Sequence, residues 1–253
     1  MDSMESRRNA IVELINKNGT VSFTQIKNAF PDVSEMTLRT DLKALDAAKR
    51  IVRIHGGAKS VQVVIGTDDF INKRSVRNIQ AKQRIAKKAL TLLQPNTNIF
   101  LDSGSTTTEF ARIFPDQSNL IYTSGLTCAT ELANLEKPSV TLPGGNLNRY
   151  SLSVYGYSAI HELERVNFAQ TYLGVTSFSY DTGFTCGSND EALLKQTAMR
   201  QSRQTIVLMD SSKIGAVSSF NICNLKDVDI IVSDDLLPEE FVLECRRNNV
   251  TIL

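Results

Sequence analysis

The chain has 253 residues, of which 42% are hydrophobic and 22% are charged, and its formal net charge at pH 7 is +1. This is the composition of an ordinary globular protein, long enough for a small domain and a larger one. No apolar run approaches 18 residues and the N-terminus MDSMESRRNA is polar, so we expect neither a membrane span nor a signal peptide. The expected location is the cytoplasm.

Two short helices are predicted first. Residues 5–17 (ESRRNAIVELINK) repeat apolar side chains on one helical face, and the NGT after them supplies a stop. Residues 24–30 (TQIKNAF) place Ile26 and Phe30 four positions apart, and Pro31 ends the run. The first 60 residues hold ten Lys or Arg against seven Asp or Glu, a mild excess that permits DNA binding without requiring it.

A third helix follows in VSEMTLRTDLKALDAAKR, with Ser34 as its N-cap. Its leucines recur at spacings of four and three, so one face is expected to pack inward. The opposite face carries short hydroxyl groups and flexible cations, which suit base edges and phosphates in a DNA major groove. The candidate DNA-binding residues here are Ser34, Met36, Thr37, Arg39, Thr40 and Lys43.

Residues 50–65 (RIVRIHGGAKSVQVVI) have the pattern of a β-hairpin that turns at Gly56 and Gly57. Basic side chains near the turn suit the DNA backbone, and Arg53, His55 and Gly56 are further candidate DNA-binding residues. Three helices and a basic hairpin predict a winged helix-turn-helix domain of α+β type. From periodicity alone, a three-helix protein-binding domain remains the alternative.

Residues 66–81 are polar and lack a continuous apolar stripe, so we interpret them as a linker that can be partly helical, leading into a helix at KQRIAKKALTLL. From residue 98, predicted strands alternate with predicted helices. The strands are NIFLD, NLIYT, SVTL, FAQTYL, TIVLM and DIIVS, and the helices between and after them are TTEFARIF, TCATELANL, NDEALLKQTAMRQ and PEEFVLECRR. This alternation predicts an α/β domain with a mainly parallel, Rossmann-like sheet.

Small and hydroxyl residues follow several of these strands, at the edge where parallel sheets bind ligands. They are residues 102–107 (DSGSTT), 123–125 (TSG), 143–146 (PGGN) and 210–213 (DSSK). Glycine lets the backbone approach an anion, and helix N-termini and hydroxyl groups donate hydrogen bonds to it. One phosphate monoester with a polyhydroxy body would satisfy this set.

Stretches at both ends of the chain resemble the DeoR family of bacterial transcriptional regulators. They are VSEMTLRTDLKALDAAKRIVRIHGGA near the N-terminus and, further on, LDSGSTTTEFA, LPGGNLN with Gly156, LGVTSFSYDTGFT, NDEALLKQTAM and LMDSSKIG. The resemblance implies a recognition helix at 34–48, a wing turn at 55–57 and a C-terminal sugar-phosphate domain related to ribose-5-phosphate isomerase. Thr40, Lys49 and Ser124 depart from the family pattern, which usually has arginine, glycine and asparagine there. The implied division is a DNA-binding domain at 1–59, a linker at 60–80 and an effector domain at 81–253.

The resemblance also implies which residues bind the effector. They are Asp102, Ser103, Gly104, Ser105, Thr106 and Thr107 in the phosphate or sugar loop, with Ser124, Gly144, Gly145, Lys195 and Lys213 around it. Lys195 and Lys213 are expected as cationic contacts and the two glycines as a wall of close approach. Because a carboxylate repels phosphate, Asp102 is expected to accept hydrogen bonds from sugar hydroxyls or to orient the loop.

Two functions are compatible with these residues. The first is a repressor of a carbohydrate catabolic operon, a homodimer or homotetramer on operator DNA, controlled by a phosphorylated sugar. The second is a sugar-phosphate isomerase with Asp102, Asp181 or Glu191 as base, although a full acidic cluster cannot be assembled. We favour the regulator and expect no catalytic residue, cofactor or metal site. The four scattered cysteines are expected to be buried thiols, and GFTCG a glycine-rich turn.

Overall fold

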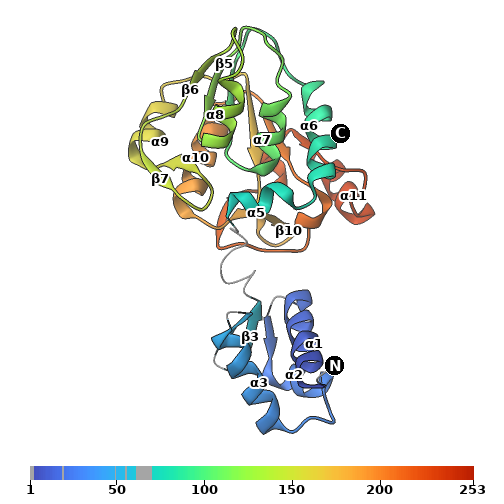
Figure 1. Ribbon diagram of the computed structural model, residues 1–253. Helices are drawn as coiled ribbons and strands as arrows, with labels where there is room; N and C mark the ends of the chain where they lie inside the picture. The colour runs from blue at the N-terminus through green and yellow to red at the C-terminus, as the bar shows by residue number, and fades with distance from the viewer. Residues whose placement is uncertain (1–2, 19, 49, 55, 61–69) are drawn as a thin grey trace. The chain divides into compact units, whose positions relative to one another are not determined.

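The computed structural model describes residues 3–18, 20–48, 50–54, 56–60 and 70–253. The chain forms two compact units, Met1–Thr67 and Asp68–Leu253 (Figure 1). The first unit contains α1 (Ser3–Asn18), β1 (Thr20–Ser22), α2 (Phe23–Ala29), α3 (Glu35–Ala47), β2 (Ile51–Ile54) and β3 (Gly57–Ser60). This element order confirms the winged helix-turn-helix fold.

The strands of the first unit form a three-stranded antiparallel sheet in the order β1-β3-β2. The three-residue strand β1 was not predicted, because TVS is too short to show alternation. Its pairing depends on Gly57, where a Cβ atom would lie only 2.2 Å from the carbonyl oxygen of Val21. The three helices and the sheet enclose one core, which includes Ile11, Leu38 and Ile51.

The second unit carries the larger sheet. Its elements are α5 (Ile71–Val76), α6 (Ile79–Leu90), β4 (Asn98–Leu101), α7 (Ser105–Arg112), β5 (Leu120–Thr123), α8 (Leu126–Leu132), β6 (Ser139–Thr141), β7 (Asn146–Asn148), β8 (Ser153–Tyr155), α9 (Tyr157–Leu163), β9 (Gln170–Gly174), β10 (Ser177–Ser179), β11 (Gly183–Cys186), α10 (Asn189–Arg200), β12 (Thr205–Leu208), the 3-10 turn η1 (Ser211–Lys213), β13 (Phe220–Cys223), the 3-10 turn η2 (Leu225–Asp227), β14 (Ile230–Val232), α11 (Glu239–Arg247) and β15 (Thr251–Ile252). The predicted Rossmann-like alternation of strands and helices is confirmed.

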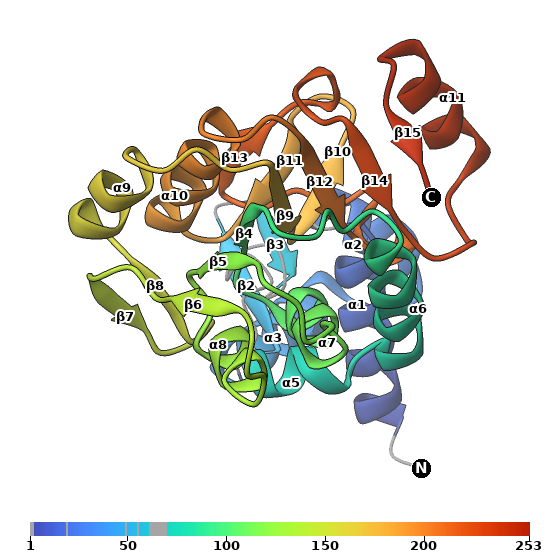
Figure 2. The same cartoon turned by 90° about the horizontal axis from the view of Figure 1, so that it is seen from above.

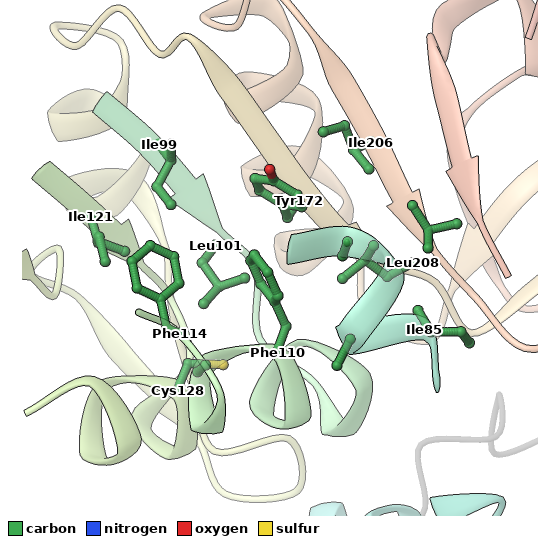
Figure 3. Close-up of a cluster of buried hydrophobic side chains, with 14 of the residues drawn as sticks. Ile85, Ile99, Leu101, Phe110, Phe114, Ile121, Cys128, Tyr172, Ile206 and Leu208 are labelled. Atoms are coloured by element: carbon green, nitrogen blue, oxygen red, sulfur yellow. The ribbon is translucent and has the colours of Figure 1, made fainter. Parts of the chain in front are cut away.

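Seven strands pair in parallel in the order β15-β14-β12-β9-β4-β5-β6. Helices α6, α7 and α8 cover one face, and α9 and α10 lie on the other (Figure 2). Alternate residues of β4 point to opposite faces of the sheet. Ile99 and Leu101 pack with Phe110 of α7 (Figure 3), while Phe100 packs against α9 and α10. Both faces are therefore buried, as expected for a parallel sheet.

The structure corrects two sequence-based interpretations. Residues 71–80 are not a linker: α5 and the start of α6 pack on the second unit, with Ile71 only 4% exposed. One buried residue in a six-residue helix gives no apolar stripe to detect. GFTCG is not a turn: β11 pairs antiparallel with both β10 and β13, and Gly183 (φ +71°) begins it. The glycines hid a strand whose four residues are all buried.

No helix within the described ranges is long and apolar enough to cross a membrane. No group of three or more His, Cys, Asp or Glu side chains in these ranges could hold a metal ion. The four cysteines are buried, as predicted.

Candidate functional site

The centre of the candidate site is the point where the strand order reverses. From β4 the chain proceeds through β5 and β6 toward one edge of the sheet, and then from β9 through β12 and β14 toward the other. A crevice for ligands opens at the carboxyl ends of strands at such a reversal. Asp102 directly follows β4, and one of its carboxylate oxygens accepts a hydrogen bond of 3.0 Å from the backbone N–H of Gly174 at the end of β9.

Asp102 and Lys195 form a buried ion pair at this point. The two side chains are 2% and 5% exposed, and the Lys195 ammonium group also donates to the carbonyl oxygen of Gly174 at 3.0 Å. Burial raises the pKa of Asp102, and the charge of Lys195 offsets this only in part. Burial acts to lower the pKa of Lys195, but Asp102, together with Cys186 and Glu191, outweighs burial and holds that pKa above its ordinary value. Lys195 therefore compensates the carboxylate that would otherwise repel a bound anion.

The loop 102–107 continues into α7 through Gly104, whose φ of +142° is one that L side chains rarely adopt. The hydroxyl groups of Thr107 and Thr108 donate to the carbonyl oxygen of Gly104 at 2.9 and 2.7 Å, which fixes the turn. The remaining hydroxyl residues, Ser103, Ser105 and Thr106, are each 8% exposed and make no side-chain hydrogen bond within the described residues. Together with the first amide groups of α7, which have no partner inside the helix, they can bind an anion.

Beneath this loop lies the thiol of Cys128, on α8. Its sulfur atom is 3.5 Å from the carbonyl oxygen of Asp102 and 3.7 Å from the hydroxyl oxygen of Thr107. Burial raises the pKa of Cys128 to about 11. The sulfur atom supports the loop from the side of the hydrophobic core (Figure 3).

The other predicted effector residues are spread around the same edge. Ser124 follows β5, and its hydroxyl group is buried without a partner among the described residues. Gly145 is required by packing, since a Cβ atom there would lie 2.4 Å from the carbonyl oxygen of Tyr155, whereas a Cβ atom at Gly144 would meet open space. Lys213 lies partly exposed in η1, after β12.

A second buried network, which the sequence pattern did not predict, is centred on Glu191 of α10. Its carboxylate accepts hydrogen bonds from Asn148 at 3.0 Å, from Ser151 at 2.5 Å and from Ser153 at 2.7 Å. These contacts hold the β7–β8 hairpin against α10. Because the donors lie about forty residues away on two short unpredicted strands, only the LPGGNLN motif marked this region.

The exposed face of α3 carries the predicted DNA-binding residues. Ser34 caps the helix by accepting from the Thr37 N–H at 3.2 Å, and the Thr40 hydroxyl donates to the carbonyl oxygen of Met36 at 2.9 Å. Arg39 lies over the ring of Phe23, 4.1 Å from its centroid. On this face Met36, Arg39, Thr40 and Lys43 are exposed, as are Arg53 and Gly56 in the hairpin, whereas His55 lies outside the described residues.

The position of α3 depends on Asp41, which is 1% exposed. Its two carboxylate oxygens accept hydrogen bonds from Arg7 at 2.7 Å and from Arg8 at 2.8 Å, both on α1. Burial alone would raise the pKa of Asp41, but the two arginines outweigh it and hold the pKa below its ordinary value. These two arginines therefore join α1 to α3.

Replacing Asp41 by asparagine is therefore expected to lower the free energy of unfolding of the first unit by about 2–3 kcal/mol, the loss of a charged hydrogen-bond acceptor. In the wild type this stability is present above about pH 3.9, the ordinary value for aspartate. It is lost as the pH falls through the lowered folded pKa. Urea unfolding followed by circular dichroism between pH 2 and 7 measures both effects. Exposed Asp32 provides the control, and a similar loss in Asp32→Asn would contradict the role of Asp41.

Comparison with known proteins matches both units. Residues 7–64 match the family profile described as the DeoR-like helix-turn-helix domain, and residues 77–235 match the DeoR C terminal sensor domain. The chain is 33% identical over 247 residues to the uncharacterized HTH-type transcriptional regulator YulB of Bacillus subtilis, covering 97% of this chain and 95% of the relative. It is 30% identical to the putative aga operon transcriptional repressor of Escherichia coli O157:H7, covering 98% and 92%.

Among solved structures, ribose 5-phosphate isomerase A of Methanocaldococcus jannaschii is similar with a TM-score of 0.40 and 16% identity. The match covers 54% of this chain and 55% of the isomerase.

Proposed function

Because the chain belongs to the DeoR family of transcriptional regulators, we propose that a phosphorylated sugar, bound where β4 and β9 end, controls its binding to operator DNA. The observation that carries this proposal is the loop 102–107. It offers three buried hydroxyl groups and the amide end of α7 next to a carboxylate whose charge Lys195 compensates. Such a site attracts a phosphate group and keeps hydrogen-bonding capacity for sugar hydroxyls.

The regulated genes and the assembly belong to the same proposal. Two relatives are named as repressors, the putative aga operon repressor and GlcR of Bacillus subtilis, which supports repression. The proposed target is a carbohydrate operon. The effector relieves its repression, and the protein acts in the cytoplasm. Two half-sites of an operator require two recognition helices at a fixed spacing, which supports a homodimer or homotetramer. The relatives that match nearly the whole chain are regulators, so the chain is a regulator and not an enzyme.

The proposal is tested by fluorescence anisotropy with labelled DNA from upstream of the chain's own gene. The protein is titrated alone and with triose, pentose and hexose monophosphates and their unphosphorylated sugars. We expect one phosphorylated sugar to change the Kd for DNA by at least about 5-fold, the lower end of typical allosteric coupling. DNA binding that no phosphorylated sugar alters would overturn the effector, and absence of specific DNA binding would overturn the regulator.

A Lys43→Gln variant is expected to weaken DNA binding about equally for all sequences. An exposed lysine at the middle of α3 suits a phosphate, and losing one such contact reduces the slope of log K against log salt by about 1. The control is Lys226→Gln, which makes the same charge change at an exposed residue of the second unit. Equal slopes for Lys43→Gln and the wild type would remove Lys43 from the interface.

A further inference from the structure

Helix α5 lies between the two matched segments, since the helix-turn-helix profile ends at residue 64 and the sensor profile begins at residue 77. It nevertheless packs on the candidate site. Figure 1 shows α5 crossing the ends of α7 and α8. Each part of α5 contacts a different element of the candidate site.

At its start, α5 is attached to the β7–β8 hairpin. The backbone N–H of Ile71 donates to the carbonyl oxygen of Tyr150 at 2.8 Å, and the rings of Phe70 and Tyr150 lie 5.0 Å apart. The same hairpin is held on its other side by Glu191. The start of α5 is therefore tied to the hairpin that Glu191 holds against α10.

After its end, α5 is attached to the loop 210–213. Asn78, in the left-handed conformation with φ 52°, joins α5 to α6. Its side-chain amide donates to Asp210 at 3.3 Å and to the Ser212 hydroxyl at 3.2 Å. Positive charge gathers here: burial and then the charge of Lys213 lower the pKa of Lys82 to about 8, while Asp210 opposes the shift. An anion nearby would be attracted to this end of α5.

Between these two attachments, α5, α7 and α8 together line an open cavity of about 250 Å³. Its lining includes Asn72 and Ser75 from α5, Ser105 and Thr108 from α7, and Thr127 from α8, and the paired side chains of Arg112 and Glu131 also border it. Ser105 is the first residue of α7, is 8% exposed and has no side-chain hydrogen bond within the described ranges. The cavity thus meets the anion site at a buried hydroxyl group that still needs a partner.

We propose that α5 completes the effector site: the polyhydroxy body of the sugar occupies this cavity against Asn72 and Ser75, while its phosphate lies at the start of α7. The volume is just under the roughly 300 Å³ at which ligand pockets begin, which suits a small polyol. The inference rests on the proposed function. Because α5 is the first helix described in the second unit, an effector that holds α5 in place acts on the part of this unit that comes next after the DNA-binding unit in the chain.

The first test compares Ser75→Leu, which fills the cavity, with Val76→Leu, which adds bulk to the same helix at a residue 74% exposed to solvent. Isothermal titration measures binding of two probes: inorganic phosphate, and the sugar monophosphate that most stabilises the wild type in a thermal-shift panel of triose, pentose and hexose phosphates. We expect Ser75→Leu to weaken sugar-phosphate binding at least 10-fold with little change for inorganic phosphate. We expect Val76→Leu to bind both as the wild type does.

Three outcomes would overturn the inference. Wild-type binding of the sugar monophosphate by Ser75→Leu would place the sugar elsewhere and leave the proposed function intact. Equal loss of both probes would mean that the substitution disturbs the anion site itself. A wild-type protein that responds to neither probe would remove the proposed function as well. Asn72→Ala, at an exposed residue that folding tolerates, repeats the test, with at least a 3-fold loss expected for the sugar monophosphate alone.

The second test concerns coupling to DNA. Asn78→Gly keeps the left-handed conformation, which glycine adopts freely, and removes only the two side-chain hydrogen bonds to the loop 210–213. We expect sugar-monophosphate affinity to stay within 2-fold, while the change that this ligand causes in the Kd for DNA shrinks at least 3-fold. An undiminished change would show that α5 does not transmit the binding event.

Discussion

Lys195→Met is expected to lower the free energy of unfolding of the second unit by about 3–5 kcal/mol, because it leaves Asp102 buried without its partner. The Asp102 side chain is 2% exposed, so water cannot replace the lost ammonium group. The chain has no tryptophan, so urea unfolding of the full-length protein is followed by circular dichroism. The transition of the second unit should move to lower urea concentration, while that of the first unit stays unchanged.

The double variant Asp102→Asn, Lys195→Met is the control. Removing both charges takes away the unpaired carboxylate, so most of the lost stability should return, since exchanging both partners of a buried pair is often close to neutral. A double variant as unstable as Lys195→Met would show that the lysine contributes through packing alone.

Ser105→Glu is expected to weaken effector binding by about a thousandfold. The substitution puts a negative charge at the first residue of α7, where the phosphate is proposed to bind. Two like charges 4 Å apart repel by about 4 kcal/mol at a partly shielded site, which corresponds to roughly three powers of ten in affinity. The measurement is the thermal shift of the second unit with the sugar monophosphate that stabilises the wild type most.

The matched control for this variant is Ser105→Gln, which has the same shape as glutamate without its charge. It should lose binding by far less, since it retains a hydrogen-bond donor. Equal losses in the two variants would show that size, not charge, excludes the ligand. An unchanged thermal shift in Ser105→Glu would move the anion site away from α7.

The features predictable from the sequence were those encoded locally. Ser34 stands directly before a helix with leucines at regular spacing, and the structure places its cap and its buried face as expected. The strands of the parallel sheet are short apolar runs between helices, so their existence and direction follow from neighbouring residues. The loop 102–107 was identifiable because small residues follow a strand and precede a helix.

The features that the sequence did not show depend on residues far apart in the chain. Lys195 pairs with Asp102 across 93 positions, and no spacing rule links them. Glu191 receives its donors from a hairpin of two three-residue strands, which are too short to show a period of two. Helix α5 has a single buried residue, Ile71, and its contacts with Tyr150 and with the loop 210–213 come only from the folded chain.

The rate at which Cys128 reacts with an alkylating reagent can report on the motion of the loop 102–107. Its thiol is fully buried beneath Asp102 and Thr107, and its pKa of about 11 leaves little reactive thiolate at neutral pH. Alkylation of this cysteine can therefore proceed only while the loop is lifted from the core. The alkylation rate of Cys128 then reports how often the unoccupied loop opens. A bound ligand that holds the loop closed would slow this alkylation, although it does not touch the sulfur atom.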